Sequence, residues 1–247
     1  IYYGPYSAQY SGNSMNGVVN YFTKMPIEKE GVLRASYFSQ NYKAYGTDDQ
    51  FDGYKGFASF GNRSGKFSYY GFYQRLENES QPQSFVSKLD TSTNNGTLVT
   101  GAFQDLDPKN RTRAILGAYG FNESKQDLFK FKGAYDFSDE IRGQFTLGLW
   151  NTSLDNDRVD NYLRDGLGNT FWDGNITYNG MRLKTSSSDW KVSQRDRENL
   201  LFGSTFEGTL DDLNFQTYFT YYGILKDKTL TSNHNPLDPA FDDTGRV

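Results

Sequence analysis

Apolar and polar residues alternate through most of the chain, with the period of two that is typical of β-strands. In the segment 127–137, Phe129, Phe131 and Tyr135 fall on one face, whereas Lys130 and Lys132 fall on the other. The same alternation occurs in the segments 32–42, 51–60, 66–76, 141–150, 200–210 and 213–225. The pattern therefore predicts an all-β chain that is built from antiparallel hairpins.

Tight and long connections separate these segments in turn. Turns are expected at 61–65, 138–140 and 211–212, and they alternate with a short link at 43–50 and long segments at about 79–125 and 155–196. In an up-and-down barrel, this order places the tight turns at one rim and the long loops at the other. The segment 112–121 has β character, but counting it as a spanning strand would move two turns to the wrong rim. We therefore expect it to lie within the long loop, as a short strand.

Two kinds of all-β protein fit this alternation, an outer-membrane β-barrel and a soluble β-sandwich. The predicted strands are longer than the roughly 5–6 residues of an average strand. Their polar faces carry Lys, Arg, Gln and Thr, and their apolar faces are rich in Phe and Tyr, as expected where aromatic girdles meet lipid headgroups. These features favour the barrel, and the sandwich remains the alternative.

The composition agrees with many strands and tight turns, since the 247 residues include 19 Tyr, 20 Phe and 25 Gly but only 6 Pro. A net charge of −4, with the two signs interspersed, argues against a nucleic-acid partner. The sequence has no apolar run of the ~18 residues that a membrane helix requires. A membrane-spanning strand needs only about 10 residues, half of which can be polar, so a membrane location is compatible.

The N-terminal segment has a Gly-Pro turn, a loop of small residues and a short apolar β segment that ends at Met25-Pro26. This order resembles the end of the plug domain of TonB-dependent outer-membrane receptors. Ser11 and Asn16 depart from the family pattern, although Asn tolerates a positive φ at a turn better than most residues. The positions that match the plug motif are Gly4, Pro5, Tyr10, Gly12, Gly17, Val18, Val19, Asn20, Thr23 and Lys24.

The resemblance implies a division of the chain into the C-terminal end of a plug domain, residues 1–26, and the N-terminal part of a transmembrane β-barrel, residues 27–247. The barrel part would hold about seven strands and long extracellular loops near 79–125 and 155–196. Receptors of this kind resemble the 22-stranded, plugged class of barrel. Since seven strands cannot close such a barrel, we expect the sequence to be an internal fragment of a longer polypeptide.

The function that the resemblance implies is energy-coupled uptake of a scarce nutrient across the bacterial outer membrane. A ferric siderophore is the expected cargo because iron chelates are the commonest in the family; cobalamin, oligosaccharides and peptides are alternatives. The implied partners are outer-membrane lipid, lipopolysaccharide, a TonB-type energy-coupling protein and the small-molecule substrate. A passive porin, an adhesion barrel and a soluble carbohydrate-binding β-sandwich are the competing functions.

Residues that could support catalysis or bind a metal do not form a recognised motif. His234 is the single histidine, there is no cysteine, and no phosphate-binding glycine loop occurs. The run Asp155–Asp160 lacks the glycine and the distant glutamate of a calcium loop. We therefore expect no enzyme, no resident metal and no cofactor.

The long loops combine arginines with large aromatic residues. Arginine donates paired hydrogen bonds to anionic groups, and aromatic planes stack on flat ligands, so the mixture suits an anionic or aromatic chelate. The same residues could equally pack the loops on one another or on lipopolysaccharide. Other members of this set are Phe103, Arg158, Tyr162 and Phe171. The candidate ligand-binding residues are Arg111, Arg113, Arg164, Trp172, Arg182 and Trp190.

Overall fold

The computed structural model describes residues 25–91 and 95–232, so all ten plug-motif positions lie outside the described residues. β-strands make up almost all of the regular structure, which confirms the all-β prediction. The strands are β1 Glu30–Ala44, β2 Thr47–Ser64, β3 Phe67–Glu79, β4 Ser84–Leu89, β5 Thr97–Leu98, β6 Phe103–Leu106, β7 Thr112–Asp136, β8 Ile141–Asn161, β9 Gly174–Tyr178, β10 Met181–Thr185, β11 Val192–Leu210 and β12 Leu213–Ser232, and a 3-10 turn, η1, spans Ser187–Asp189.

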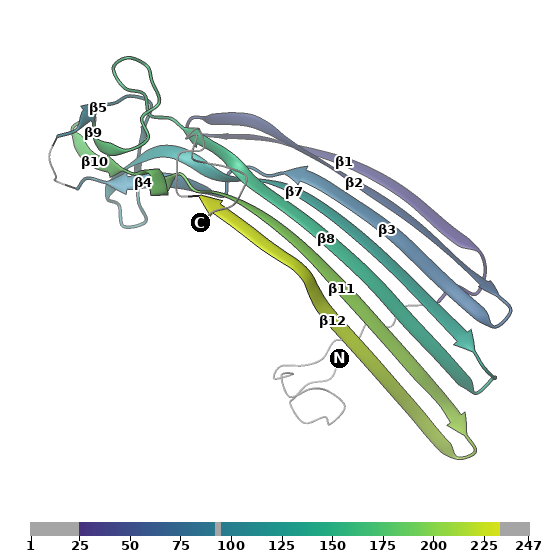
Figure 1. Cartoon of the computed structure of the whole chain (residues 1–247). Helices are drawn as coiled ribbons and strands as arrows, with labels where there is room; N and C mark the ends of the chain where they lie inside the picture. Colours follow the sequence, from purple (N-terminus) through teal and green to yellow (C-terminus); the bar gives the residue numbers. More distant parts are fainter. Residues whose placement is uncertain (1–24, 92–94, 233–247) are drawn as a thin grey trace.

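The long strands form one antiparallel sheet in the order β1-β2-β3-β7-β8-β11-β12, with β4 and β6 added to β7. Each long strand pairs with the next along the chain, apart from the β4–β6 and β9–β10 insertions (Figure 1). Within the described residues, β1 and β12 are the edges of this sheet, which is therefore open rather than closed. The antiparallel arrangement was expected from the alternation and is confirmed.

The two ends of the sheet differ. The β2–β3, β7–β8 and β11–β12 turns lie together at one end, and the longer connections lie together at the other, which we call the loop end (Figure 1). The β11–β12 turn is Asp211-Asp212, as predicted, with Asp211 at a φ of 51°. The link predicted at 43–50 is instead a tight turn, because Ala44 pairs with Thr47 and leaves two residues between the strands.

The prediction that 112–121 is a short strand within a loop is wrong. These residues are the first part of β7, which continues without a break for 25 residues. The strand bends where its register with β8 shifts, on both sides of Phe121, and Gly120 at a φ of 80° accommodates the bend. The connections at the loop end therefore span 80–111 and 162–191, and both are shorter than the predicted 79–125 and 155–196.

One face of the sheet is apolar across every long strand. The strand registers place a continuous row of residues side by side on this face: Gly31, Phe60, Gly71, Phe131, Leu147, Phe202 and Tyr221. The opposite face carries polar rows, of which one runs through Lys55, Leu76, Gln126, Thr152, Arg197 and Asp227. The sheet therefore has two chemically different faces, as the period-two pattern predicts.

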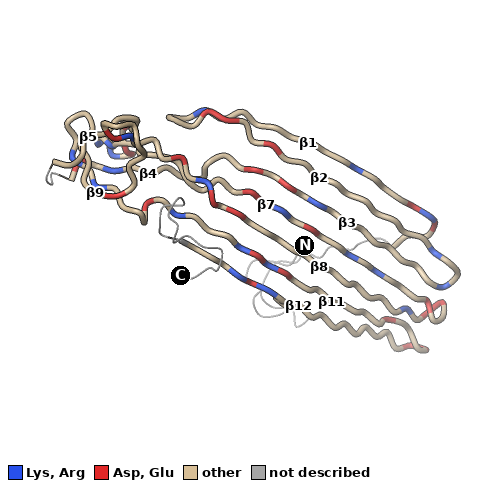
Figure 2. The backbone as a smooth tube through the Cα atoms, turned by 45° about the horizontal axis from the view of Figure 1, so that its top comes forward, with Lys and Arg blue, Asp and Glu red and all other residues tan. Residues whose placement is uncertain are grey.

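Charged residues border the apolar face on the side of the loop end. The half of β12 that is nearest the β11–β12 turn is free of charge, whereas charges recur on the other half (Figure 2). On the apolar face, the row through Tyr73, Phe129 and Leu149 is followed by a row through Arg75, Asp127, Asn151, Glu198 and Lys226. The apolar band thus ends abruptly at a charged belt, which we define by this second row.

Candidate ligand-binding site

The connections at the loop end pack into a core of their own. β10, β9 and β5 form a second sheet of three strands, and the first part of β7 pairs with β4 along one edge and with β6 along the other. The core that they enclose contains Val86, Val99, Ala102, Ala114, Leu116, Leu163, Ile176, Met181, Leu183 and Trp190. This layer gives the loop end fixed positions for the polar side chains that surround it.

Trp190 belongs to this core and not to a ligand-binding surface. Its side chain is 0% exposed, and its indole N–H donates to the backbone carbonyl of Trp172 at 3.1 Å. The two rings pack edge to face with their centroids 5.5 Å apart. A Cβ at Gly117 would lie 2.5 Å from the Trp190 ring, so the absence of a side chain at Gly117 makes room for the indole. The structure therefore places Trp190 out of reach of a ligand that enters from solvent.

Two of the candidate arginines stabilise the connection before β7. Arg113 pairs with Asp105 at 2.7 Å, and the Tyr45 hydroxyl donates to the same carboxylate at 2.9 Å. Arg111 pairs with Asp107 at 2.7 Å in the turn that leads into β7. The hydrogen bond from Arg113 makes the largest contribution to lowering the pKa of Asp105, and the bond from Tyr45 makes the next largest. Arg111 and Arg113 therefore both form ion pairs within the fold.

The third outlying arginine, Arg182 on β10, lies 4.0 Å from Asp90 in a loose ion pair. Like Arg111 and Arg113, it is outside the lining of a cavity of about 870 Å³ at the loop end. The structure therefore does not bring the six candidate residues together into one site. Of that set, Arg164 and Trp172 are the members that line the cavity.

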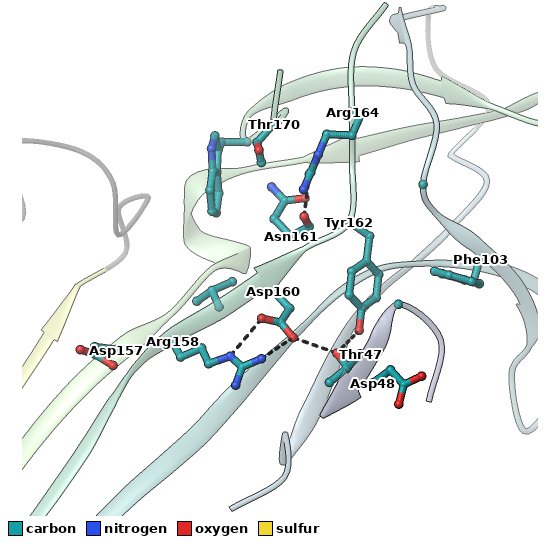
Figure 3. A pocket seen from close by; sticks show the side chains of 14 residues that line it. Thr47, Asp48, Phe103, Asp157, Arg158, Asp160, Asn161, Tyr162, Arg164 and Thr170 are labelled. Atoms are coloured by element: carbon teal, nitrogen blue, oxygen red, sulfur yellow. Dashed lines mark hydrogen bonds and ion pairs between the residues drawn. The ribbon is translucent and has the colours of Figure 1, made fainter. Parts of the chain in front are cut away.

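The cavity has a volume of about 870 Å³ and lies where the tip of the β1–β2 hairpin meets the end of β8 (Figure 3). The connections before β6 and after β8 complete its walls. The lining residues are Gly46, Thr47, Asp48, Gly101, Phe103, Asp157, Arg158, Val159, Asp160, Asn161, Tyr162, Arg164, Thr170 and Trp172.

A chain of hydrogen bonds joins the hairpin tip to β8 in this cavity (Figure 3). Thr47, which is 2% exposed, donates to the Oδ2 atom of Asp160 at 2.9 Å. The Tyr162 hydroxyl lies 2.7 Å from the Thr47 oxygen. Because the single threonine proton is used on Asp160, Tyr162 must be the donor in this second bond. Burial raises the pKa of Tyr162, which keeps its hydroxyl protonated and able to donate.

Arg158 occupies the centre of the contact between the hairpin and β8. Its guanidinium lies over the Phe121 ring, 4.3 Å from the ring centroid, and makes ion pairs with Asp49 at 2.8 Å and Asp160 at 3.2 Å. Phe121 in turn packs on Phe51 of β2 in a second buried cluster. The cation therefore links the hairpin and β8 through both charge and aromatic contact.

The hairpin reaches β8 because β2 is longer than its neighbour. β3 pairs with β2 from Gly53 onwards, whereas the preceding residues of β2, from Thr47, pair with β1 alone. This free part of the hairpin crosses the first part of β7 and contacts β8, although β3 and β7 separate β8 from β2 in the sheet. The cavity is thus a consequence of the unequal lengths of β2 and β3.

Arg158, Phe103 and Tyr162 were predicted among the loop residues, whereas Thr47 and Asp48 were not predicted, and Asp160 was considered only as the end of the run Asp155–Asp160. Thr47 and Asp48 lie at a hairpin tip, and Asp160 is among the last residues of β8. Their spacing along the chain matches no motif. The unusual density of acidic residues in the run Asp155–Asp160 was the available signal. It marks the strand end that forms one wall of the cavity.

Within residues 25–91 and 95–232, no group of three or more His, Asp or Glu side chains is placed to hold a metal ion. His234 lies outside these residues. The described part of the chain also contains no helix with the length and apolar character needed to cross a membrane.

Comparison of the chain with protein-family models, with curated proteins and with solved structures gives no match. A functional assignment therefore depends on the residues and the geometry of this chain alone.

Proposed function

We propose that this chain is part of a TonB-dependent receptor of the bacterial outer membrane that imports a scarce nutrient, with a ferric siderophore as its cargo. The observation that carries the proposal is the uncovered apolar face of the sheet. Among the described residues, many aromatic side chains of this face are exposed, including Phe60, Tyr73, Phe129, Phe145, Phe206 and Phe219. Each Å² of such surface gains about 25 cal/mol when it leaves water, so a lipid environment suits this face.

The border of the apolar band supports a membrane interface. Tyr54 and Tyr73 keep their rings on the apolar face, and their hydroxyls donate to Glu77 and Asp127 at or beside the charged belt. Tyrosines with an apolar body and a polar tip are favoured at the boundary between hydrocarbon and headgroups. The belt would then lie at the level of the headgroups and of lipopolysaccharide.

A soluble β-sandwich would need a second sheet over the same apolar face. The second sheet that the structure contains is small and packs at the loop end, on the core that includes Leu116 and Trp190. The observed layout, with tight turns at one end and packed connections at the other, suits outer-membrane strands with short periplasmic turns and larger extracellular loops. The polar face would then line the interior of a barrel.

Two further observations support the receptor assignment. The segment 4–24 resembles the end of a plug, and the cavity beside Thr47 and Arg158 provides a place at the extracellular end where a ligand could bind. In this proposal, residues 1–26 belong to a plug, residues 27–247 belong to the barrel, and a TonB-type protein supplies energy from the inner membrane. The outer membrane lacks an energy source of its own, which is why such a partner is required.

The experiment that tests the proposal combines location with transport. The receptor polypeptide that contains this chain is expressed in a Gram-negative host, membranes are fractionated, and uptake of radioactive ferric chelates is measured with and without a functional TonB-type protein. We expect the protein in the outer membrane and uptake that is lost without energy coupling. Recovery in the soluble fraction would favour the sandwich, and uptake that is independent of coupling would favour a passive porin.

A further inference from the structure

An apolar groove crosses the apolar face of the sheet near the β7–β8 and β11–β12 turns, and a polar cavity of mixed charge adjoins it at the turns (Figure 1). We propose that the two together hold one zwitterionic aminophospholipid, with an acyl chain in the groove and the headgroup at the turns. This inference rests on the part of the proposed function that places the sheet in a membrane. It goes beyond that function because it assigns a bound lipid to the end opposite the candidate ligand-binding site.

Large and small side chains alternate in two neighbouring rows of the apolar face, across β7, β8, β11 and β12. The row nearer the turns is Tyr135, Gly143, Phe206 and Thr217. The next row has the opposite order of sizes and is Gly133, Phe145, Ser204 and Phe219. The small residues leave space between the rings of their neighbours, and the result is a groove of about 370 Å³.

The groove is open to the surroundings of the sheet. Phe137 and Phe219, which line it, are 55% and 58% exposed. A Cβ at Gly143 would lie 3.1 Å from the Phe137 ring and 3.6 Å from the Phe206 ring, so the glycine keeps the space between these rings free. All the described residues that line the groove are uncharged. Its volume is at the lower end of the roughly 300–1,000 Å³ that is usual for compact organic ligands, which suits part of one acyl chain.

A polar cavity of about 400 Å³ lies at the ends of the same strands. Successive residues contribute to the two sites, because Tyr135 and Phe137 line the groove whereas Asp136 lines the polar cavity. The residues of the β7–β8 turn, 138–140, also line the polar cavity. An apolar site and a polar site therefore meet at this turn, and an amphiphile has the same division into an apolar and a polar part.

Lys66 is the cation that is placed to meet a lipid phosphate. Arg63 and Arg142 also line the polar cavity, but both pair with Asp136, at 2.7 Å and 3.6 Å. The exposed Lys66 ammonium donates to the backbone carbonyl of Phe137 at 3.0 Å, at the border of the groove. An ammonium group has three protons, so two remain for phosphate oxygens.

The carboxylates of the β7–β8 turn favour a primary ammonium in the headgroup. Asp139 and Glu140 are exposed and line the same cavity as Lys66, and these two anions and one cation give a net charge of −1. A primary ammonium can donate hydrogen bonds to both carboxylates, whereas the trimethylammonium of choline has no N–H group. A headgroup that carries only the phosphate charge would be repelled. Phosphatidylethanolamine has one phosphate and one primary ammonium, and it therefore matches the site.

Native mass spectrometry of the purified receptor polypeptide that contains this chain tests the inference. The detergent contains equal amounts of phosphatidylethanolamine, phosphatidylcholine and phosphatidylglycerol. We expect one retained lipid for each protein molecule and a preference of roughly threefold or more for phosphatidylethanolamine, since exposed ion pairs contribute modestly. Equal retention of the three lipids, or a preference for either of the others, would overturn the inference.

Substitutions separate the acyl-chain site from the headgroup site. Thr217→Trp fills the groove from an exposed position and is expected to reduce retention of all three lipids. Ala58→Trp is the matched control, because Ala58 is exposed on the same face but lies outside the groove. Lys66→Gln should also weaken retention of all three lipids, which share the phosphate. The double variant Asp139→Asn, Glu140→Gln should make phosphatidylethanolamine and phosphatidylcholine equal.

Equal lipid retention in Thr217→Trp and Ala58→Trp would show that the groove does not hold an acyl chain. A preference for phosphatidylethanolamine that survives the double variant would be equally contrary to the inference. The headgroup substitutions lie at exposed turn positions, so they test the site even where the tryptophan substitution disturbs folding. Each of these results leaves the receptor function to be judged separately, by outer-membrane location and energy-dependent uptake.

Discussion

Thr47, at the tip of the β1–β2 hairpin, donates a hydrogen bond of 2.9 Å to Asp160 near the end of β8, although 113 positions separate the two residues in the chain. This bond and the Arg158 ion pairs hold the hairpin against a strand that is not its neighbour in the sheet. Since both residues line the cavity, the shape of the candidate site depends on this contact.

Replacement of Thr47 with Val is therefore expected to loosen the hairpin tip. The variant keeps the shape of the side chain but leaves Asp160 and Tyr162 without their shared partner, at a cost of about 1–3 kcal/mol. Urea unfolding followed by tryptophan fluorescence measures the loss. Thr229→Val, at an exposed position on β12, is the control, and equal stability of the two variants would contradict the role of Thr47.

Trp190→Ala is expected to destabilise the packed connections at the loop end by about 3–5 kcal/mol, as is usual for truncation of a fully buried tryptophan. The measurement is limited proteolysis of the segment 162–191, which should become sensitive while the long strands stay resistant. Trp150→Ala is the control, because Trp150 is exposed. A Trp190 variant with intact connections but lost ligand binding would instead favour direct contact with the ligand.

Gly133→Ala is expected to disturb the apolar face. A Cβ at this position would lie 2.4 Å from the Phe145 ring, which covers the glycine from the neighbouring strand. Displacing the ring should cost about 1–3 kcal/mol. Gly56→Ala is the matched control, since no atom lies within 4 Å of a Cβ there, and it should be neutral or slightly stabilising. The midpoint of thermal unfolding in detergent compares the two, and similar midpoints would contradict the ring contact.

The Asp105–Arg113 pair predicts a loss of stability in acid. Hydrogen bonds from Arg113 and then from Tyr45 lower the pKa of Asp105 below its ordinary value of 3.8. Its contribution is therefore present above that value and is lost as the pH falls through the lower, folded-state pKa. We expect the urea midpoint of the loop end to decrease below pH 4, and to depend less on pH in Asp105→Asn. An identical pH profile in the variant would exclude Asp105 as the cause.

The sequence by itself determined the secondary structure of the long strands. In 127–137 and 141–150, alternate residues had to face opposite sides once the backbone was extended, so the apolar and polar faces could be read from the period of two. The Asp211-Asp212 turn could also be predicted from local sequence, because aspartate tolerates the backbone conformation that a tight turn requires.

Tertiary structure decided where strands end and which residues meet. β7 continues through 112–121 because β4, β6 and β8 pair with its backbone there, and these partners come from distant parts of the chain. For the same reason, the six candidate ligand residues separated into core, ion-pair and cavity positions. The alternation along a strand predicts which residues share a face of the sheet, but it carries no information on the contact between Thr47 and Asp160. That contact depends on the relative lengths of β2 and β3 and on the bend of β7.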